Sequence, residues 1–179
     1  MSNKNTNTRD ITKIAIMAAL VFVATYLIKI PSLNGYVHLG DSMIFIAVLL
    51  IVTLLSLLLG SKKGALAGGL GAALCDLLSG YMQYIIPTFF IKLIMALIMG
   101  VIAEKLITKT KFSWIIGAII GGAFQVFGYA LVETILYGFA GAIASVPGNI
   151  IQSVSGVIIA TVLVIILEKS HVLKKLKNV

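Results

Sequence analysis

The chain has 179 residues, of which 60% are hydrophobic and only 11% are charged, and its mean hydropathy is +1.11. One soluble core of this length cannot bury so much apolar surface, so the composition excludes an ordinary water-soluble domain and indicates a membrane protein. The net charge of +8 does not indicate a nucleic-acid-binding protein, because the basic residues border apolar segments and do not form one solvated face.

Six apolar stretches are long enough to be candidates for helices that cross the hydrocarbon core, which takes roughly 20 residues. They cover residues 11–30, 41–59, 64–80, 88–107, 112–137 and 143–167. The connections between them are too short to fold separately, so we expect a single integral membrane domain over residues 1–179. Because every backbone amide in lipid must be satisfied within its own segment, the predicted fold class is an all-α membrane protein with six transmembrane helices in one bundle.

The basic residues predict the orientation of this bundle. All of them except Lys29 and Lys92 lie near the termini or near two connections, and six spans would place these regions on one side of the membrane. The opposite connections, around Asn34, Gln83 and Gly141, contain no Lys or Arg. Since positively charged regions stay inside, we expect both termini to be cytoplasmic and the lysines to lie near membrane lipid headgroups.

Two places in the chain are expected to interrupt helices. Residues 31–40 should form an outward-facing loop, because Pro31, Asn34 and Gly35 are poor helix formers, and this loop is a candidate lid. The Pro147-Gly148 pair should break the chain near the outer start of the sixth helix.

Small residues recur at a spacing of four in the predicted helices, which lets helix backbones approach closely in lipid. The pairs are Ala15 and Ala19, Gly64 and Gly68, and Gly117 and Gly121. Such faces serve packing within one bundle more often than docking of a partner, so we expect close helix contacts there.

Four ionisable residues lie inside apolar segments. Each costs about 2.5 to 3.5 kcal/mol near the bilayer centre and therefore requires a partner, a water-filled cavity or a function. They are Asp41, Asp76, Lys92 and Glu133. Helices that alternate in direction place all four in the outer half of the membrane, which predicts a shared outer cavity.

Other polar and aromatic side chains are expected around the same cavity. Gln125, Tyr129 and Glu133 follow at intervals of four and form one stripe on the fifth helix. The candidate ligand-binding residues are His38, Asp41, Asp76, Tyr84, Lys92, Gln125, Tyr129, Glu133, Asn149 and Gln152. Carboxylates, amides, an ammonium and phenols around one hollow suit a small polar aromatic molecule.

A structural role stays open for several of these residues. Asp41 could cap its helix, and Asp76 could pair with Lys92 to join the third helix to the fourth. His38 could be an ordinary interfacial residue. Glu133 is better explained as a ligand contact, because it shares a helix face with two other polar groups.

Sequence motifs for catalysis and for metal binding are absent. The two histidines, His38 and His171, would lie on opposite sides of the bilayer, which does not support a metal site. The run 60–64, Gly-Ser-Lys-Lys-Gly, lacks the spacing of a phosphate-binding loop. We therefore expect no enzymatic activity, no cofactor and no ATP hydrolysis by this chain.

The sequence contains three stretches that occur together in one transporter family. They are Val37-His38-Leu39-Gly40-Asp41, the glycine- and alanine-rich run 64–81, and Ile91-Lys92. With them, nearly the whole chain resembles the substrate-binding S components of energy-coupling factor (ECF) transporters. The resemblance is strongest to the branch for hydroxymethylpyrimidine, pyridoxine or related vitamins.

This resemblance implies a function and a set of partners. An S component of the prokaryotic plasma membrane would capture a vitamin at the outer face and topple to deliver it inward. A transmembrane T component and two cytosolic ABC ATPases on separate chains would drive this step. Ala15, Ala18 and Ala19 match the alanine-rich motif that docks to the T component. Riboflavin, thiamine and pantothenate stay open as alternative substrates.

Two hypotheses of other kinds are also open. The chain could be a stand-alone ion-coupled carrier in which Asp76 and Glu133 relay protons or sodium, although no inverted repeat is visible in the sequence. Alternatively, it could be an assembly subunit whose buried polar groups only pair with each other.

Overall fold

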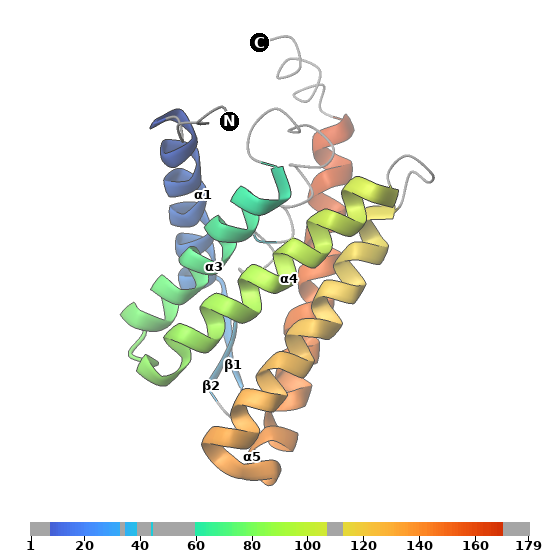
Figure 1. The fold of residues 1–179 in the computed structure, drawn as a ribbon. Helices are drawn as coiled ribbons and strands as arrows, with labels where there is room; N and C mark the ends of the chain where they lie inside the picture. Colours follow the sequence, from blue (N-terminus) through green and yellow to red (C-terminus); the bar gives the residue numbers. More distant parts are fainter. Residues whose placement is uncertain (1–7, 33–34, 39–43, 45–59, 107–112, 170–179) are drawn as a thin grey trace, which may run out of the picture.

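A computed structural model of the chain describes residues 8–32, 35–38, 44, 60–106 and 113–169. Its elements, in chain order, are helix α1 (Thr8–Leu27), strands β1 (Lys29–Ser32) and β2 (Gly35–His38), helix α3 (Gly60–Leu78), the 3-10 helix η2 (Met82–Tyr84), helix α4 (Ile85–Leu106) and helix α5 (Ser113–Lys169). Helix α3 packs against both α1 and α4, and α4 packs against α5 (Figure 1). The predicted helix over 41–59 lies outside the described residues, except for Ile44.

Helix α5 consists of two antiparallel halves that meet at Gly138 (Figure 1). Gly138 has φ 77° and ψ 171°, a backbone conformation that favours glycine. The turn confirms the separation of the predicted helices 112–137 and 143–167, although the connection is shorter than expected. The expected break at Pro147 is wrong, since the helix continues through this residue. A membrane bundle tolerates an internal proline because neighbouring groups can satisfy the carbonyl that it leaves free.

The connection after α1 forms an antiparallel β-hairpin, so the prediction of a purely helical chain is wrong here. Lys29 pairs with His38, and Pro31 pairs with Tyr36. Helix α1 ends at Leu27. Pro31 has no backbone N–H and disfavours the helical conformation in the residue before it, which explains why the helix does not continue through residue 30.

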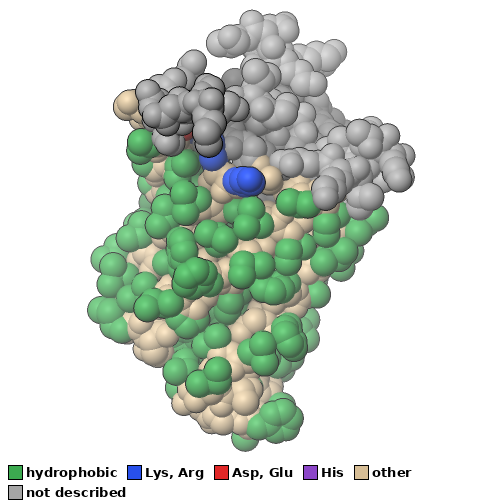
Figure 2. Space-filling model, in the orientation of Figure 1, with side chains coloured by type: hydrophobic (Ala, Val, Ile, Leu, Met, Phe, Trp, Pro, Cys, Tyr) green, Lys and Arg blue, Asp and Glu red, His purple; other side chains and the backbone are tan. Residues whose placement is uncertain are grey.

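The described helices include several that could span a membrane. Three segments are long and apolar enough by length and composition: Asp10–Leu27, Met82–Ala103 and Trp114–Val162, the last of which includes both halves of α5. The molecule is therefore a helical membrane protein with several candidate spans. Its surface agrees with this conclusion, because many large hydrophobic side chains are exposed and they are spread over the part of the face in Figure 2 that is not grey.

Small residues dominate the described core, which lets the helices approach closely. The core residues are Val21, Ile44, Ala65, Ala72, Met95, Ala96, Met99, Ala103, Trp114, Ala118 and Ala160. A Cβ atom on Gly117 would lie 2.9 Å from the backbone oxygen of Met99, so the expected close contact between α5 and α4 is confirmed there. A Cβ atom on Gly71 would lie 2.6 Å from the backbone oxygen of Ala18, which shows that α1 and α3 touch through backbone.

The two ends of the bundle differ in character. We call the end that carries β1, β2, η2 and Gly138 the hairpin end. Thr8 and Lys169 lie at the opposite end (Figure 1). An ion pair of 2.5 Å between Lys63 and Asp10 joins α3 to α1 there, and the lysine and arginine side chains visible in Figure 2 gather at that same end.

Candidate functional site

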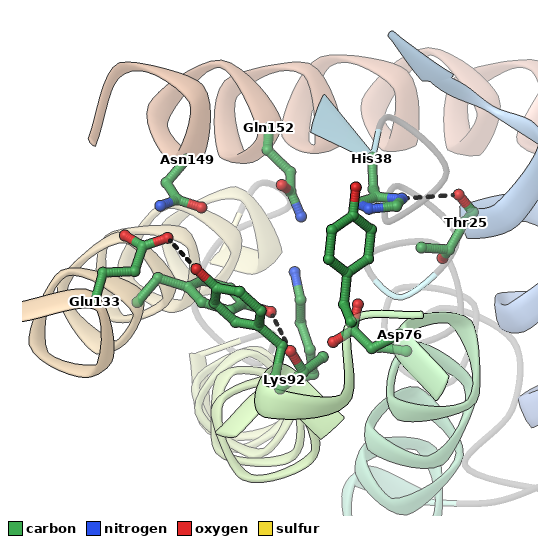
Figure 3. Close-up of a pocket in the computed structure, with 12 residues that line it drawn as sticks. Thr25, His38, Asp76, Lys92, Glu133, Asn149 and Gln152 are labelled. Carbon is green, nitrogen blue, oxygen red and sulfur yellow. Dashed lines mark hydrogen bonds between the residues drawn. The ribbon is translucent and has the colours of Figure 1, made fainter. Parts of the chain in front are cut away.

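A polar cavity lies near the hairpin end, between helices that are distant in sequence (Figure 3). Its volume is about 110 Å³. The lining residues are Thr25, His38, Ala72, Asp76, Tyr81, Tyr84, Thr88, Lys92, Tyr129, Glu133, Asn149 and Gln152. They come from α1, β2, α3, η2, α4 and both halves of α5.

Lys92 lies on the α4 side of the cavity and is only 1% exposed. Its Nζ atom donates a hydrogen bond of 2.8 Å to Oε1 of Gln125 and lies 5.5 Å from the ring centroid of Tyr129. Hydrogen bonding and the aromatic ring both offset the cost of burying an ammonium group. Gln125 itself is fully buried and does not line the cavity, so it acts by holding Lys92.

Glu133 connects both halves of α5 with η2. Its Oε1 atom accepts a hydrogen bond of 3.3 Å from the hydroxyl group of Tyr84, and its Oε2 atom accepts one from the hydroxyl group of Ser145. The side chain is 7% exposed and still reaches the cavity. Hydroxyl donors favour the charged carboxylate, which would otherwise be costly at this depth.

Tyrosine rings form an aromatic wall around Tyr84. The ring centroids of Tyr84 and Tyr129 are 6.5 Å apart, and those of Tyr84 and Tyr81 are also 6.5 Å apart. The hydroxyl group of Tyr129 donates to Oγ1 of Thr88 at 3.1 Å, which fixes its ring toward the cavity. Such rings provide flat apolar surface and polar edges, and both can contact an aromatic ligand.

The remaining polar groups approach from the other sides. His38 donates a hydrogen bond of 3.1 Å from Nδ1 to the backbone oxygen of Thr25, which joins the hairpin to α1. Asp76 belongs to α3, and Asn149 and Gln152 extend from the second half of α5 toward the space above Lys92 (Figure 3).

The structure brings most of the predicted site residues together. His38, Asp76, Tyr84, Lys92, Tyr129, Glu133, Asn149 and Gln152 all line the cavity. Gln125 lies behind Lys92, and Asp41 lies outside the described residues. The role of the predicted residues in ligand binding stays a prediction, because lining one cavity does not show that a ligand binds there.

Sequence reasoning missed the hydroxyl residues of the site. Thr25 and Thr88 line the cavity, and Ser145 hydrogen-bonds to Glu133. Serine and threonine occur commonly in membrane helices, where they bond to their own backbone or pack closely, so they give no signal by themselves.

The alanine-rich face of α1 is divided between two sides of the helix. Ala18 is 5% exposed and packs toward Gly71 of α3, whereas Ala15 and Ala19 are exposed. The expected close packing therefore belongs to Ala18. Of these three alanines, only Ala15 and Ala19 are open to a partner among the residues that the structure describes.

No group of three or more His, Cys, Asp or Glu residues that could hold a metal ion occurs among the residues that the structure describes. The cavity instead combines two carboxylates, one ammonium group, two side-chain amides and several phenols. This set can bind a small aromatic ring by stacking and can exchange hydrogen bonds with donors and acceptors on its edge.

Comparison with known proteins assigns a family. The family model described as "ECF-type riboflavin transporter, S component" matches residues 5–169. A protein of Lactococcus lactis named thiamine precursor transporter HmpT is 31% identical over 172 residues, which cover 94% of this chain and 93% of the relative. A protein of Pyrococcus woesei, described as "Uncharacterized protein in gap 3'region", is 36% identical over 151 residues, which cover 83% of this chain and 95% of the relative.

Proposed function

Because this chain belongs to the S components of ECF-type transporters, we propose that it captures hydroxymethylpyrimidine, a thiamine precursor, or a chemically similar pyridine. Membership in the family makes the chain a subunit of a transporter and not an enzyme, and a multi-pass protein of the cell membrane. It also implies a vitamin or vitamin precursor as substrate and an ECF module as partner.

The observation that carries this proposal is the meeting of the buried Glu133 and Lys92 with the tyrosine rings in one cavity. The exocyclic amine of an aminopyrimidine can donate to a carboxylate, and its ring nitrogens can accept from Lys92 or from an amide. The pyrimidine ring can stack on Tyr84 or Tyr129. Similarity to a thiamine precursor transporter supports the same class of ligand.

The arrangement of charges supports an outward-facing site. Lys62 and Lys63 lie at the end opposite to the hairpin, and positively charged ends of membrane proteins stay in the cytoplasm. The hairpin end, with the cavity, then faces outward and receives the ligand. A transmembrane T component and two cytosolic ABC ATPases would complete the importer, and the exposed Ala15 and Ala19 on α1 are the candidate contacts with the T component.

Riboflavin is the second candidate, because the matching family model is described as riboflavin-type. Its larger ring system carries no primary amine, and its ribityl chain requires several additional hydrogen bonds. Two carboxylates, Asp76 and Glu133, are better matched to a ligand that donates from an amine, so the composition of the cavity favours the smaller molecule.

Direct binding measurements test the proposal. Calorimetry on the purified chain in detergent, without ATP, should show nanomolar affinity for hydroxymethylpyrimidine. Riboflavin should bind at least about 100-fold more weakly, because it lacks the primary amine from which the carboxylates would accept a hydrogen bond. Tighter binding of riboflavin would reverse the choice of substrate, and no binding of any vitamin would refute the assignment of the cavity.

A further inference from the structure

A second cavity lies beside the first at the hairpin end. Its volume is about 300 Å³. The lining residues are Tyr81, Gln83, Tyr84, Glu133, Tyr137, Gly141, Ala144 and Ser145. Tyr81, Tyr84 and Glu133 line both cavities, so side chains and not a helix separate the two spaces. We call the second space the outer cavity and the first the inner cavity.

Tyr84 is the main element of this partition. Its ring centroid lies 6.5 Å from that of Tyr129, which lines the inner cavity, and 6.3 Å from that of Tyr137, which lines the outer cavity. The bond between its hydroxyl group and Glu133 is 3.3 Å long, beyond the usual 2.5 to 3.0 Å for an O–H···O bond. The hydroxyl group of Tyr84 also bonds to that of Tyr137, so side-chain contacts alone hold the ring in its place between the cavities.

The backbone around Tyr84 also favours movement of this side chain. Tyr84 ends η2, a 3-10 helix of three residues with no buried members. Short 3-10 segments have poorer hydrogen-bond geometry than α-helices and often occur as connectors. Rotation of the Tyr84 side chain about its own bonds leaves the packed helices α3 and α4 in place.

The outer cavity offers aromatic rings and hydrogen-bonding groups like those of the inner cavity, but fewer charged groups. Tyr81 and Tyr137 offer rings for stacking, and Gln83 and Ser145 offer hydrogen-bonding groups. Lys92 and Asp76 line only the inner cavity. The same aromatic ligand would therefore bind more loosely outside and more tightly inside.

We infer that the outer cavity is an encounter site through which the ligand reaches the inner cavity, with Tyr84 as the partition between the two. This inference rests on the proposed function, because it concerns the same small aromatic ligand. The ligand first lies among Tyr81, Gln83 and Tyr137 and then passes inward when Tyr84 turns away from Glu133.

A route past the hairpin is the alternative, and the contacts favour the route past Tyr84. The hairpin is joined to α1 through the bond of 3.1 Å between His38 and Thr25, and β2 also contacts α5. Opening that side requires a paired two-stranded element to move. Opening the other side requires the rotation of one side chain.

A variant that fills the outer cavity tests this route. Ala144 is exposed, lines only the outer cavity and does not touch the inner one, so Ala144→Trp should obstruct passage without altering the bound ligand. We expect the association and dissociation rates of labelled hydroxymethylpyrimidine, measured by rapid filtration, to fall together by about tenfold while Kd changes less than about threefold. Ile143→Trp is the matched control, because Ile143 is 55% exposed and lines neither cavity.

A second variant changes the partition itself. Tyr84→Phe keeps the ring and removes the hydroxyl bonds to Glu133 and Tyr137, so both rates should rise by a larger factor than Kd changes. Tyr26→Phe, on the exposed side of α1, should leave both rates unchanged.

The possible failures are distinguishable. If the wild-type chain binds hydroxymethylpyrimidine but Ala144→Trp and Tyr84→Phe leave both rates at the wild-type values, the ligand enters elsewhere and this inference is wrong. A change in the dissociation rate alone would also overturn it, because a pathway must affect both directions. Absence of binding to the wild-type chain would refute the proposed function and this inference with it.

Discussion

Glu133 accepts hydrogen bonds from the hydroxyl groups of two residues in different parts of the chain. Tyr84 reaches it from η2, and Ser145 reaches it from the returning half of α5. The carboxylate is thereby held at the boundary between the two cavities, with its charge stabilised before any ligand arrives. Pre-formed contacts of this kind reduce the cost of ordering the site when the ligand binds.

Replacing Glu133 by glutamine tests its role as an acceptor for the ligand. The neutral amide keeps the size but weakens a charge-assisted hydrogen bond worth about 1.5 to 3 kcal/mol, so Kd for hydroxymethylpyrimidine should rise by about 10- to 100-fold in calorimetry.

Thr134→Val is the control, because Thr134 is the next residue, is exposed and bonds only to the backbone oxygen of Ala130 in the described part of the chain. If Glu133→Gln lowers the thermal stability but leaves the affinity unchanged, the polar cluster is structural, and the hypothesis of an assembly subunit gains support.

At the scale of single residues, the sequence indicated which charged side chains line the cavity but not which hydroxyl side chains do. Asp76, Lys92 and Glu133 were predicted because a charge among apolar residues requires compensation. Ser145 was missed because a hydroxyl group can bond to its own helix and requires none. Gln125 was placed in the cavity by its spacing from Glu133, but the stripe continues below the cavity, where Gln125 supports Lys92.

Among the helices, α3 depends on glycine for its contact with α1. A Cβ atom at Gly71 would lie 2.6 Å from the backbone oxygen of Ala18 and 2.7 Å from Cβ of Val21. Neither atom belongs to the flexible end of a side chain, so the two helices would have to separate. The contact matters for the site because α1 carries Thr25 and α3 carries Asp76.

Gly71→Ala should therefore destabilise the protein by about 1 to 3 kcal/mol, the usual cost of overpacking. Cys75 is the only cysteine of the chain and is 1% exposed, so its reaction with a thiol-reactive fluorophore during heating reports unfolding in detergent. The midpoint should fall by several degrees. Leu70→Ala, on the exposed side of the same helix, should have a much smaller effect, and equal midpoints for the two variants would argue against a tight α1–α3 contact.

The apolar runs of the sequence predicted the positions of the described helices, but they did not predict the structure of the connections between them. The third predicted helix, 64–80, corresponds to Gly60–Leu78, and the fourth, 88–107, corresponds to Ile85–Leu106. The β-hairpin was predicted as a loop, because four-residue strands with a proline give no alternating pattern. The connection at Gly138 was predicted as longer, since glycine and alanine residues after it fit both a loop and a helix.

For the molecule as a whole, the separation of charge and cavity between the two ends predicts its orientation. Lys62 is exposed at one end and Gln83 is exposed at the hairpin end, next to the outer cavity. The positive-inside rule places the first end in the cytoplasm and the second outside.

Cysteine labelling in intact cells tests this orientation. In a Cys75→Ala background, Gln83→Cys should react with a membrane-impermeant maleimide added to whole cells, and Lys62→Cys should react only after the cells are permeabilised. The reverse pattern would invert the bundle and would move the cavity to the cytoplasmic side, which is incompatible with capture of an external vitamin.

The one-residue turn at Gly138 has a consequence for how such a protein can change its substrate. It folds residues 129–152 back on themselves, so that Tyr129, Glu133, Asn149 and Gln152 line the same cavity from two antiparallel half-helices. Four of the twelve lining residues of the inner cavity thus belong to one contiguous stretch of the chain, which does not include the face of α1 that carries Ala15 and Ala19. Substitutions within this stretch can therefore change the chemistry of the cavity without altering that face of α1.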